Sequence, residues 1–297
     1  MKRLSDNEII DELKRRLEES RRALHDIEGA TRRLETVNRK LQESEALKSN
    51  FLSNIRNEIN NPLSSIMALS EQIMKGDIEA AMVPDMAALI FSETFELDYQ
   101  LKNIFIAAEL EAGESAMSVA RLDLDVFVHH LLRTFDHRIK AKKLQVEIDC
   151  GGGPDCENVE FKTDPEKLQA IMVNLLGNAI EYSHEGKRIR ISAQVADGKL
   201  TLSVRDEGPG IANEHSKQVF DRFAQGETGS RKSHKGHGLG LSIVKALVDI
   251  MGGYVTLKST VGEGCEFIVI VPEVAGAPDD VFSVDGNELI FDADEEF

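Results

Sequence analysis

The chain has 297 residues, a formal net charge of −17 and an isoelectric point near 5.0. Its length allows two or three folded units, at least one of them with a full hydrophobic core. The acidic charge argues against nucleic acid and anionic membrane surfaces as partners, because both bind basic faces. There is no apolar run of about 18 residues and no apolar leader, so direct membrane insertion is not expected and a cytoplasmic location is predicted.

The three cysteines, Cys150, Cys156 and Cys265, form neither a disulfide framework nor a metal-ligand pattern by their spacing. Such sparse use of cysteine is expected of a reducing compartment. We therefore interpret them as structural residues.

Residues 1–44 have the seven-residue apolar repeat of a coiled-coil signalling helix. Two rows carry the repeat, interrupted by Ser20, Thr31 and Asn38: Ile10, Leu17 and Leu24 on one, and Leu13, Ile27, Leu34 and Leu41 on the other. Asn38 favours a parallel dimer in fixed register, because a buried amide is satisfied only opposite its twin. A single amphipathic helix packed on the body of the protein is the alternative interpretation.

The sequence of residues 45–115 predicts a helical hairpin that forms dimers. One helical pattern runs from about Glu45 to Lys75, and a second follows Pro84 and ends near Gly113. Each pattern has an apolar stripe too wide for one partner helix. Two hairpins from two chains are therefore expected to form a dimeric four-helix bundle continuous with the coiled coil.

From residue 120 to residue 273 the sequence alternates strand and helix patterns, which predicts an α/β sandwich of the α+β class. Helices are expected at 126–142, 165–182 and 241–251, and strands at 144–149, 189–196, 199–206, 254–260 and 265–271. The Asp-Gly pair at 197–198 predicts a tight turn between two of these strands.

Four stretches of this domain stand out, in this order: NLLGNAIEYS at 174–183, RDEGPGI at 205–211, VFDRFAQ at 219–225 and GHGLGLSIVK at 236–245. Glycines in the second and fourth stretches allow positive φ and a close approach of backbone to a ligand. Gly240 and Leu241 open a helix whose free N–H groups suit a phosphate. One glycine-rich stretch is weak evidence, but the four together predict a nucleotide site.

These stretches resemble the N, G1, F and G2 boxes of the ATP-binding domain of sensor histidine kinases, a Bergerat-type fold shared with gyrase-type ATPases and certain chaperones. The upstream hairpin resembles the dimerisation and phosphotransfer domain of the same kinases. It reads NEINNP at 57–62 where the family has His-Glu-x-x-(Thr or Asn)-Pro. The resemblance covers about residues 45–272, and the hairpin excludes the gyrase and chaperone branches.

The resemblance implies ATP or ADP and Mg²⁺ as ligands. Asn178 is expected to coordinate Mg²⁺, with Asn174 one helical turn earlier lining the same face. Asp206 is expected to accept a hydrogen bond from the adenine amino group. The remaining implied nucleotide-binding residues are Gly208, Gly210, Gly236, Gly238, Leu239 and Gly240. Residues 226–235, GETGSRKSHK, resemble the mobile lid of the family, and its basic residues Arg231, Lys232, His234 and Lys235, the lid bases, could meet the triphosphate.

Two positions depart from the family pattern. Glu181 stands where the family often has a basic residue, so a phosphate contact is missing, and the lid bases are the candidates to compensate for it. Asn57 stands where the acceptor histidine belongs, beside Glu58, whose carboxylate would hold or accept the imidazole proton. An amide lone pair is delocalised into its carbonyl, so no phosphoramidate can form at Asn57. None of the eight histidines of the chain lies on the predicted hairpin.

Asn57 leaves two interpretations open: a natural pseudokinase that binds Mg-ATP and signals as a dimer, or a true histidine kinase whose acceptor has been replaced. Asn61 adds a third, because the resemblance implies that Thr or Asn at this position orients a water that dephosphorylates a receiver domain. The expected partners are a second copy of the chain and, in trans, a response-regulator receiver domain or another histidine kinase.

Residues 274–297 are predicted to be an acidic tail. From residue 273 to the end there are nine carboxylates and no Lys or Arg, which is typical of a solvated segment. Within the tail, VFSV and ELIF flank an Asp-Gly-Asn turn, a pattern that also fits a short β-hairpin. The carboxylates are candidates to compete with phosphate for the lid bases.

Overall fold

The computed structural model describes residues 15–16, 21, 29, 31–32, 34–39, 56, 59–76, 79–113, 115–150, 159–221 and 238–274. The chain divides into two compact units, residues 1–58 and 59–297. The described residues of the first unit are helical. Most of the predicted coiled coil and all of the acidic tail after residue 274 lie outside the described residues, so both stay predictions.

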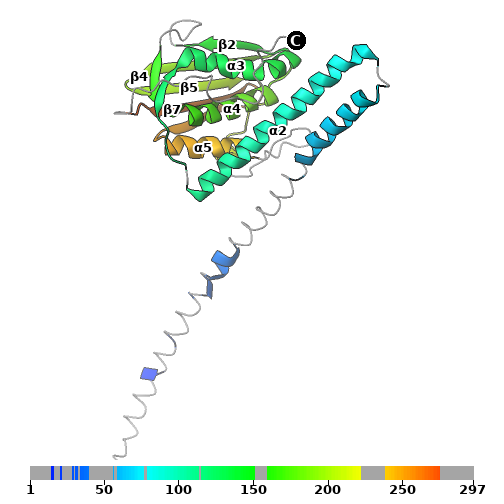
Figure 1. Cartoon of the computed structure of the whole chain (residues 1–297). Helices are drawn as coiled ribbons and strands as arrows, with labels where there is room; N and C mark the ends of the chain where they lie inside the picture. The colour runs from blue at the N-terminus through cyan, green and yellow to red at the C-terminus, as the bar shows by residue number, and fades with distance from the viewer. Residues whose placement is uncertain are drawn as a thin grey trace, which may run out of the picture. The chain divides into compact units, whose positions relative to one another are not determined.

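Two helices of the second unit form the predicted hairpin (Figure 1). The first covers residues 59–75 and ends at Gly76, whose φ of 71° is left-handed. The second, α2 (Val83–Ala112), ends at Gly113, which is also left-handed with a φ of 71°. Glycine ends helices in this way because it has no Cβ to clash. Among the described residues, no helix is both long enough and apolar enough to cross a membrane.

A mixed sheet with helices on one face makes up the rest of the second unit (Figure 1). The helices are α3 (Leu124–Ala141), α4 (Pro165–Tyr182) and α5 (Gly240–Ile250). The strands are β2 (Gln145–Asp149), β4 (Arg188–Ala196), β5 (Lys199–Asp206), β6 (Tyr254–Thr260) and β7 (Gly264–Pro272). They lie in the order β2-β4-β5-β7-β6, with β2 parallel to β4 and the other pairs antiparallel. The predicted hairpin followed by an α/β sandwich is confirmed.

Some elements of the second unit were not predicted. The strands β1 (Ala120–Asp123) and β3 (Glu160–Thr163) pair antiparallel in a small separate sheet. Two 3-10 turns, η1 (Ala80–Met82) and η2 (Gln218–Phe220), are three residues each. Segments of three or four residues are too short to show a periodic apolar pattern.

The core lies between α4 and the inner face of the sheet. Every second side chain is buried along residues 188–193 of β4 and along β5, as expected for strands with one covered face. The fully buried residues of this core include Leu168, Ile171, Met172, Leu175, Leu176 and Ile180 of α4 and Ile189, Leu200, Leu202, Val204, Val269 and Val271 of the sheet. This packing fixes α4 along nearly its whole length.

The start of α4 is fixed by a buried carboxylate. Asp164 is 0% exposed, and its side chain accepts from the backbone N–H of Lys167 at 3.0 Å and of Ser118 at 2.8 Å. The ammonium of Lys167 adds an ion pair at 2.9 Å. Aspartate at the N-cap accepts a hydrogen bond from an N–H group of the first turn. Proline at the first helical position has no N–H, but the N–H at that position would have no partner within the helix.

One expectation about the cysteines is wrong. Cys150, directly after β2, is disulfide-bonded, whereas Cys265 is the free cysteine of the described part. We expected no bridge because the spacing showed no framework. A single bridge leaves no such spacing in a sequence.

Candidate nucleotide-binding site

The first predicted site residues lie along α4. Asn174 and Asn178 are one helical turn apart, Asn174 being 1% exposed and Asn178 half-buried. The first residue of α5 approaches Asn174 so closely that a Cβ on Gly240 would lie 2.6 Å from Asn174 Oδ1. Leu239, the residue before α5, makes no side-chain cap, and the first N–H groups of a helix suit an anionic ligand.

Asp206 lies at the opposite end of this region, as the last residue of β5. Its carboxylate is 5% exposed, and Oδ1 accepts from the backbone N–H of Gly208 at 2.9 Å and of Cys265 at 3.3 Å. Burial raises the pKa of this carboxyl, and the two backbone donors oppose the rise. A buried carboxylate held by backbone donors is a fixed acceptor, and a fixed acceptor selects ligands by the donor they present.

Glycines allow the Asp206 loop to touch its neighbours. A Cβ on Gly208 would lie 2.7 Å from the carbonyl oxygen of Tyr182, at the end of α4. Gly210 has a φ of 68°, and its Cβ would lie 2.1 Å from the carbonyl of Thr260. No other residue type fits either position without moving backbone.

The turn between β6 and β7 supports the same loop from the other side. Ile211 N–H donates to the Ser259 hydroxyl at 2.7 Å, and Gly262 N–H donates to the carbonyl of Pro209 at 2.7 Å. The Ser259 hydroxyl donates in turn to the carbonyl of Gly264 at 3.0 Å. Sequence reasoning did not identify Ser259, because its role depends on a contact 48 residues away in the chain.

The structure therefore places Asn174, Asn178, Asp206, Gly208 and Gly240 around α4. From Asn174 to Tyr182 the helix rises by about 12 Å, with the N-terminus of α5 at one end and the Asp206 loop at the other. A buried acceptor at one end and a helix N-terminus at the other fit an extended ligand that has a donor group at one end and an anionic group at the other.

Several predicted site residues are not placed. Asn57 and Glu58 lie outside the described residues, as do Gly236 and the lid bases Arg231, Lys232, His234 and Lys235. Gly238 is described, with a φ of 67°, and Leu239 is buried. Asn61 is exposed on the first hairpin helix.

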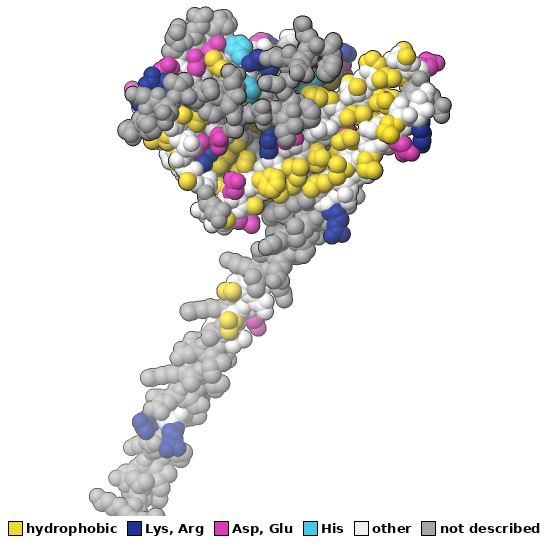
Figure 2. Space-filling model, viewed as in Figure 1, with side chains coloured by type: hydrophobic (Ala, Val, Ile, Leu, Met, Phe, Trp, Pro, Cys, Tyr) yellow, Lys and Arg dark blue, Asp and Glu magenta, His cyan; other side chains and the backbone are white. Residues whose placement is uncertain are grey.

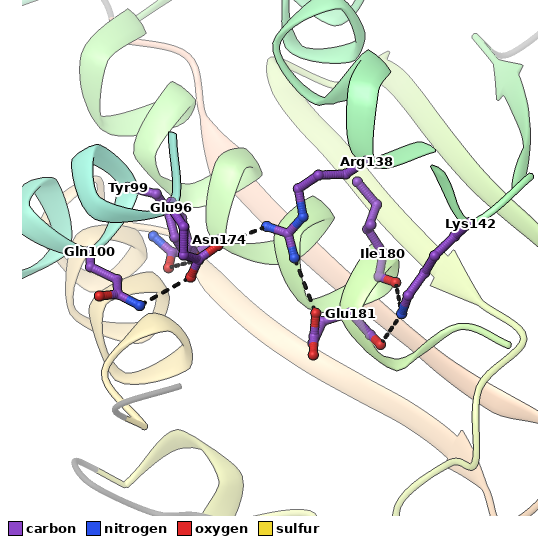
Figure 3. Close-up of polar contacts among 8 residues, drawn as sticks. All are labelled: Glu96, Tyr99, Gln100, Arg138, Lys142, Asn174, Ile180 and Glu181. Atoms are coloured by element: carbon purple, nitrogen blue, oxygen red, sulfur yellow. Dashed lines mark hydrogen bonds and ion pairs between the residues drawn. The ribbon is translucent and has the colours of Figure 1, made fainter. Parts of the chain in front are cut away.

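Glu181, where a basic residue was expected, has a basic partner. Its carboxylate pairs with the guanidinium of Arg138 on α3 at 3.1 Å. The ammonium of Lys142 donates to the carbonyls of Ile180 and Glu181 in the same turn (Figure 3). Two cations therefore lie beside the last turn of α4, although neither was singled out in the sequence.

Asn174 has contacts that the sequence did not predict. Its Oδ1 accepts from the hydroxyl of Tyr99 at 2.9 Å (Figure 3). Its Nδ2 donates to Asn103 Oδ1 at 2.8 Å. Both partners belong to α2 of the hairpin. Burial raises the pKa of Tyr99 to about 12, so its hydroxyl stays a donor at any physiological pH.

Within the described residues, no group of three or more His, Cys, Asp or Glu side chains is arranged to hold a metal ion. The Mg²⁺ expected from the sequence needs no such group, because Mg²⁺ commonly takes few protein ligands and completes its shell with phosphate oxygens and water. Asn178 is the residue that would supply its amide oxygen.

Part of the chain matches a known protein family. Residues 163–275 match the family of histidine kinase-, DNA gyrase B-, and HSP90-like ATPases. The chain is 27% identical over 235 residues to the circadian input-output histidine kinase CikA of Synechococcus elongatus, a match that covers 78% of the chain and 31% of CikA. The chain thus spans less than a third of the length of that relative.

Two solved structures share the fold. Full-length ShkA in complex with AMPPNP has a TM-score of 0.55 at 24% identity, covering 79% of this chain and 47% of ShkA. Histidine kinase ThkA in complex with the response regulator TrrA has a TM-score of 0.51 at 21% identity, covering 80% of this chain and 65% of ThkA.

The chain therefore shares with ShkA and ThkA the fold of a helical hairpin followed by an α/β sandwich. The match to the histidine kinase-, DNA gyrase B-, and HSP90-like ATPase family lies within this sandwich, at residues 163–275.

Proposed function

We propose that this chain is a dimeric, histidine-kinase-like signal transducer that binds Mg-ATP but cannot phosphorylate itself at Asn57. The observation that carries the nucleotide part is the buried, backbone-held carboxylate of Asp206 inside the glycine loop at the end of α4. The match of residues 163–275 to an ATPase family supports it, as does the AMPPNP in the ShkA structure.

The site residues divide into two roles in this proposal. At one end Asp206 accepts from the adenine amino group, and Gly208 and Gly210 shape the loop under the base, because each packs against a neighbouring carbonyl. At the other end the N-terminus of α5 meets the phosphates, and Asn178 offers its amide oxygen to the metal. When bound, Mg-ATP would supply the transferable γ-phosphoryl group, while the protein residues position it.

Asn57 decides the kinase part of the proposal. A phosphoryl acceptor needs a lone pair that can attack phosphorus, and a neutral imidazole has one whereas an amide nitrogen does not. The chain therefore keeps the nucleotide domain and the hairpin but has no acceptor at residue 57. A natural pseudokinase and a histidine kinase altered at this one residue make the same chemical prediction for the chain as it stands.

The homodimer is supported by apolar side chains that the hairpin leaves exposed. Figure 2 shows them along the hairpin. The residues are Leu63, Met67 and Met74 of the first helix and Val83, Leu89, Phe91 and Phe105 of α2, with exposures from 37% to 85%. Patches of this kind mark interaction surfaces, and a second hairpin is the partner that covers both helices at once.

Asn61 favours a second candidate function, a receiver phosphatase. Its side chain is exposed and so accessible to a receiver domain in trans. The complex of ThkA with a response regulator supports such a partner for this architecture. Phosphatase activity needs no acceptor at residue 57, so the two functions are compatible.

The test is incubation with γ-labelled ATP and Mg²⁺, with binding measured in parallel by calorimetry. We expect the chain to bind Mg-ATP and to acquire no acid-labile label, whereas Asn57→His binds equally and becomes labelled. Asn178→Ala should weaken binding in the presence of Mg²⁺ and leave metal-free binding nearly unchanged. Label on any histidine of the unaltered chain, or binding that is indifferent to Asn178→Ala, would contradict the proposal.

A further inference from the structure

One arginine joins three helices beside the last turn of α4. The guanidinium of Arg138, on α3, pairs with the carboxylate of Glu181 on α4 at 3.1 Å and with that of Glu96 on α2 at 3.5 Å (Figure 3). The same guanidinium lies over the ring of Phe135, 6.0 Å from its centroid. Two carboxylates and an aromatic face therefore hold this cation in one place.

The position of Glu181 on α4 connects this cation with the proposed nucleotide site. Glu181 follows Asn178 by three residues, and side chains at this spacing are neighbours on one face of a helix. In the proposed site Asn178 holds the metal, so the Glu181 carboxylate lies within about one helical turn of the place where the phosphates bind. A carboxylate there repels phosphates unless a cation neutralises it.

The second cation of this region, Lys142, has a different role. Its ammonium donates to the carbonyl of Ile180 at 2.8 Å and to the carbonyl of Glu181. Both carbonyls belong to the last turn of α4, where backbone acceptors have no partner within the helix and a nearby cation is stabilising. Lys142 is thus committed to the end of α4. The guanidinium of Arg138 is instead paired with side chains, which can change rotamer without moving the backbone.

The pair of Arg138 and Glu181 is partly open to solvent. The side chain of Arg138 is 19% exposed and that of Glu181 is 29% exposed. A pair that water reaches contributes little stability, because the charges are screened and both side chains lose rotamer freedom. A guanidinium also presents its N–H donors in a planar fork that fits phosphate oxygens as well as carboxylate oxygens. Phosphate can therefore replace the Glu181 carboxylate as the partner of Arg138.

We propose that Arg138 is a phosphate-binding residue of the nucleotide site, which exchanges the Glu181 carboxylate for phosphate oxygens when Mg-ADP or Mg-ATP binds. Glu181 then competes with the phosphates for the guanidinium and keeps it beside α4 before nucleotide arrives. This inference rests on the proposed nucleotide site. It assigns the phosphate contact to a cation on α3, outside the four sequence stretches that predicted the site.

The test compares the two partners of this ion pair in the full chain, by calorimetry with Mg-ADP, which binds without phosphoryl transfer. Arg138→Gln removes the cation and should raise Kd about tenfold, as expected for the loss of one charge-assisted hydrogen bond. Glu181→Gln removes the competing carboxylate and should lower Kd about threefold. Both variants break the same contact between α3 and α4, so a purely structural role of the pair predicts changes of Kd in the same direction.

The matched control is Lys140→Gln, which removes one positive charge from the same helix. The Lys140 side chain is 76% exposed and its ammonium pairs with Asp136, so Kd should stay unchanged. An unchanged Kd in Arg138→Gln, no fall of Kd in Glu181→Gln, or an equal rise in Lys140→Gln would each overturn the assignment of Arg138 alone. Absence of Mg-ADP binding in the unaltered chain and in every variant would overturn both this assignment and the proposed nucleotide site.

Discussion

The two ends of the site along α4 are held in different ways. At the Tyr182 end, the Asp206 loop is fixed by backbone: Gly208 lies against the carbonyl of Tyr182, and Gly210 against that of Thr260. At the Asn174 end, the side chain of Asn174 is held by the hydroxyl of Tyr99, which lies 75 positions earlier on α2 of the hairpin. Backbone contacts between packed elements change little, whereas a contact made by one side chain can be lost by a change of rotamer. We therefore expect the Asp206 end to be the more rigid of the two.

The largest expected effect tests the Asp206 end. Gly264 has a φ of 93°, and a Cβ there would lie 2.0 Å from the carbonyl oxygen of Asp206. Gly264→Ala should therefore lower the free energy of unfolding by about 3 kcal/mol or more, because strained φ and a backbone clash add. Chemical denaturation at one fixed protein concentration measures it, since a dimer is stabilised by concentration.

The matched control for this variant is Gly262→Ala in the same turn. Its φ of 86° is equally left-handed, but nothing lies within 4 Å of its Cβ. Gly262→Ala should therefore lower the free energy of unfolding by only about 1 kcal/mol, which is the cost of the backbone strain alone. Equal losses for the two variants would mean that the Asp206 loop moves freely, and the contrast between the two ends of α4 would fail.

A middle-sized effect is expected at the start of α4, which carries both ends of the site. Asp164→Ala removes a fully buried cap, so the backbone N–H groups of Lys167 and Ser118 lose this acceptor. The Lys167 ammonium loses its ion pair but keeps the carbonyl of Ala116. We expect a loss of about 2 kcal/mol in the free energy of unfolding. Asp123→Ala, at the exposed cap of α3, should cost about 1 kcal/mol. If both variants lower the free energy of unfolding equally, the buried cap of α4 contributes no more to stability than the exposed cap of α3.

The sequence predicted most of the sandwich, and for clear physical reasons. α4 was expected at 165–182 and is found there, because proline at its first turn and a continuous apolar face set both its ends. The tight turn at Asp197 and Gly198 was expected from the residue pair, and both residues have positive φ, 52° and 66°. Signals of this kind lie within one element and need no knowledge of its neighbours.

What the sequence did not predict depends on contacts between distant elements. The Tyr99–Asn174 and Glu96–Arg138 contacts join residues 75 and 42 positions apart, and no local pattern encodes them. The predicted roles of Asn178, Asp206 and the lid bases came from a resemblance, and they stay predictions until nucleotide binding is measured. Glu181 shows what the sequence and the structure each contribute. Its departure from the family pattern was visible in the sequence, but its ion pair with Arg138 was visible only in the structure.

The smallest expected effect concerns the charge of Asp206 and is measured without nucleotide. Burial raises its pKa in the folded state, so the folded protein binds this proton more tightly than the unfolded chain does. The stability that the proton contributes is therefore fully present below the ordinary carboxyl pKa and is lost as pH rises through the raised pKa of the folded state. Asp206→Asn keeps an oxygen for the N–H groups of Gly208 and Cys265 but cannot ionise.

The quantity to follow is thus the free energy of unfolding of the unaltered chain minus that of Asp206→Asn, from neutral pH into acid. Taking the difference removes the other carboxylates, which titrate in both proteins. We expect it to increase as pH falls through the raised pKa and then to level off. A difference that decreases on acidification would mean that the backbone donors outweigh burial, and that the Asp206 end is built to hold a charge in the absence of its ligand.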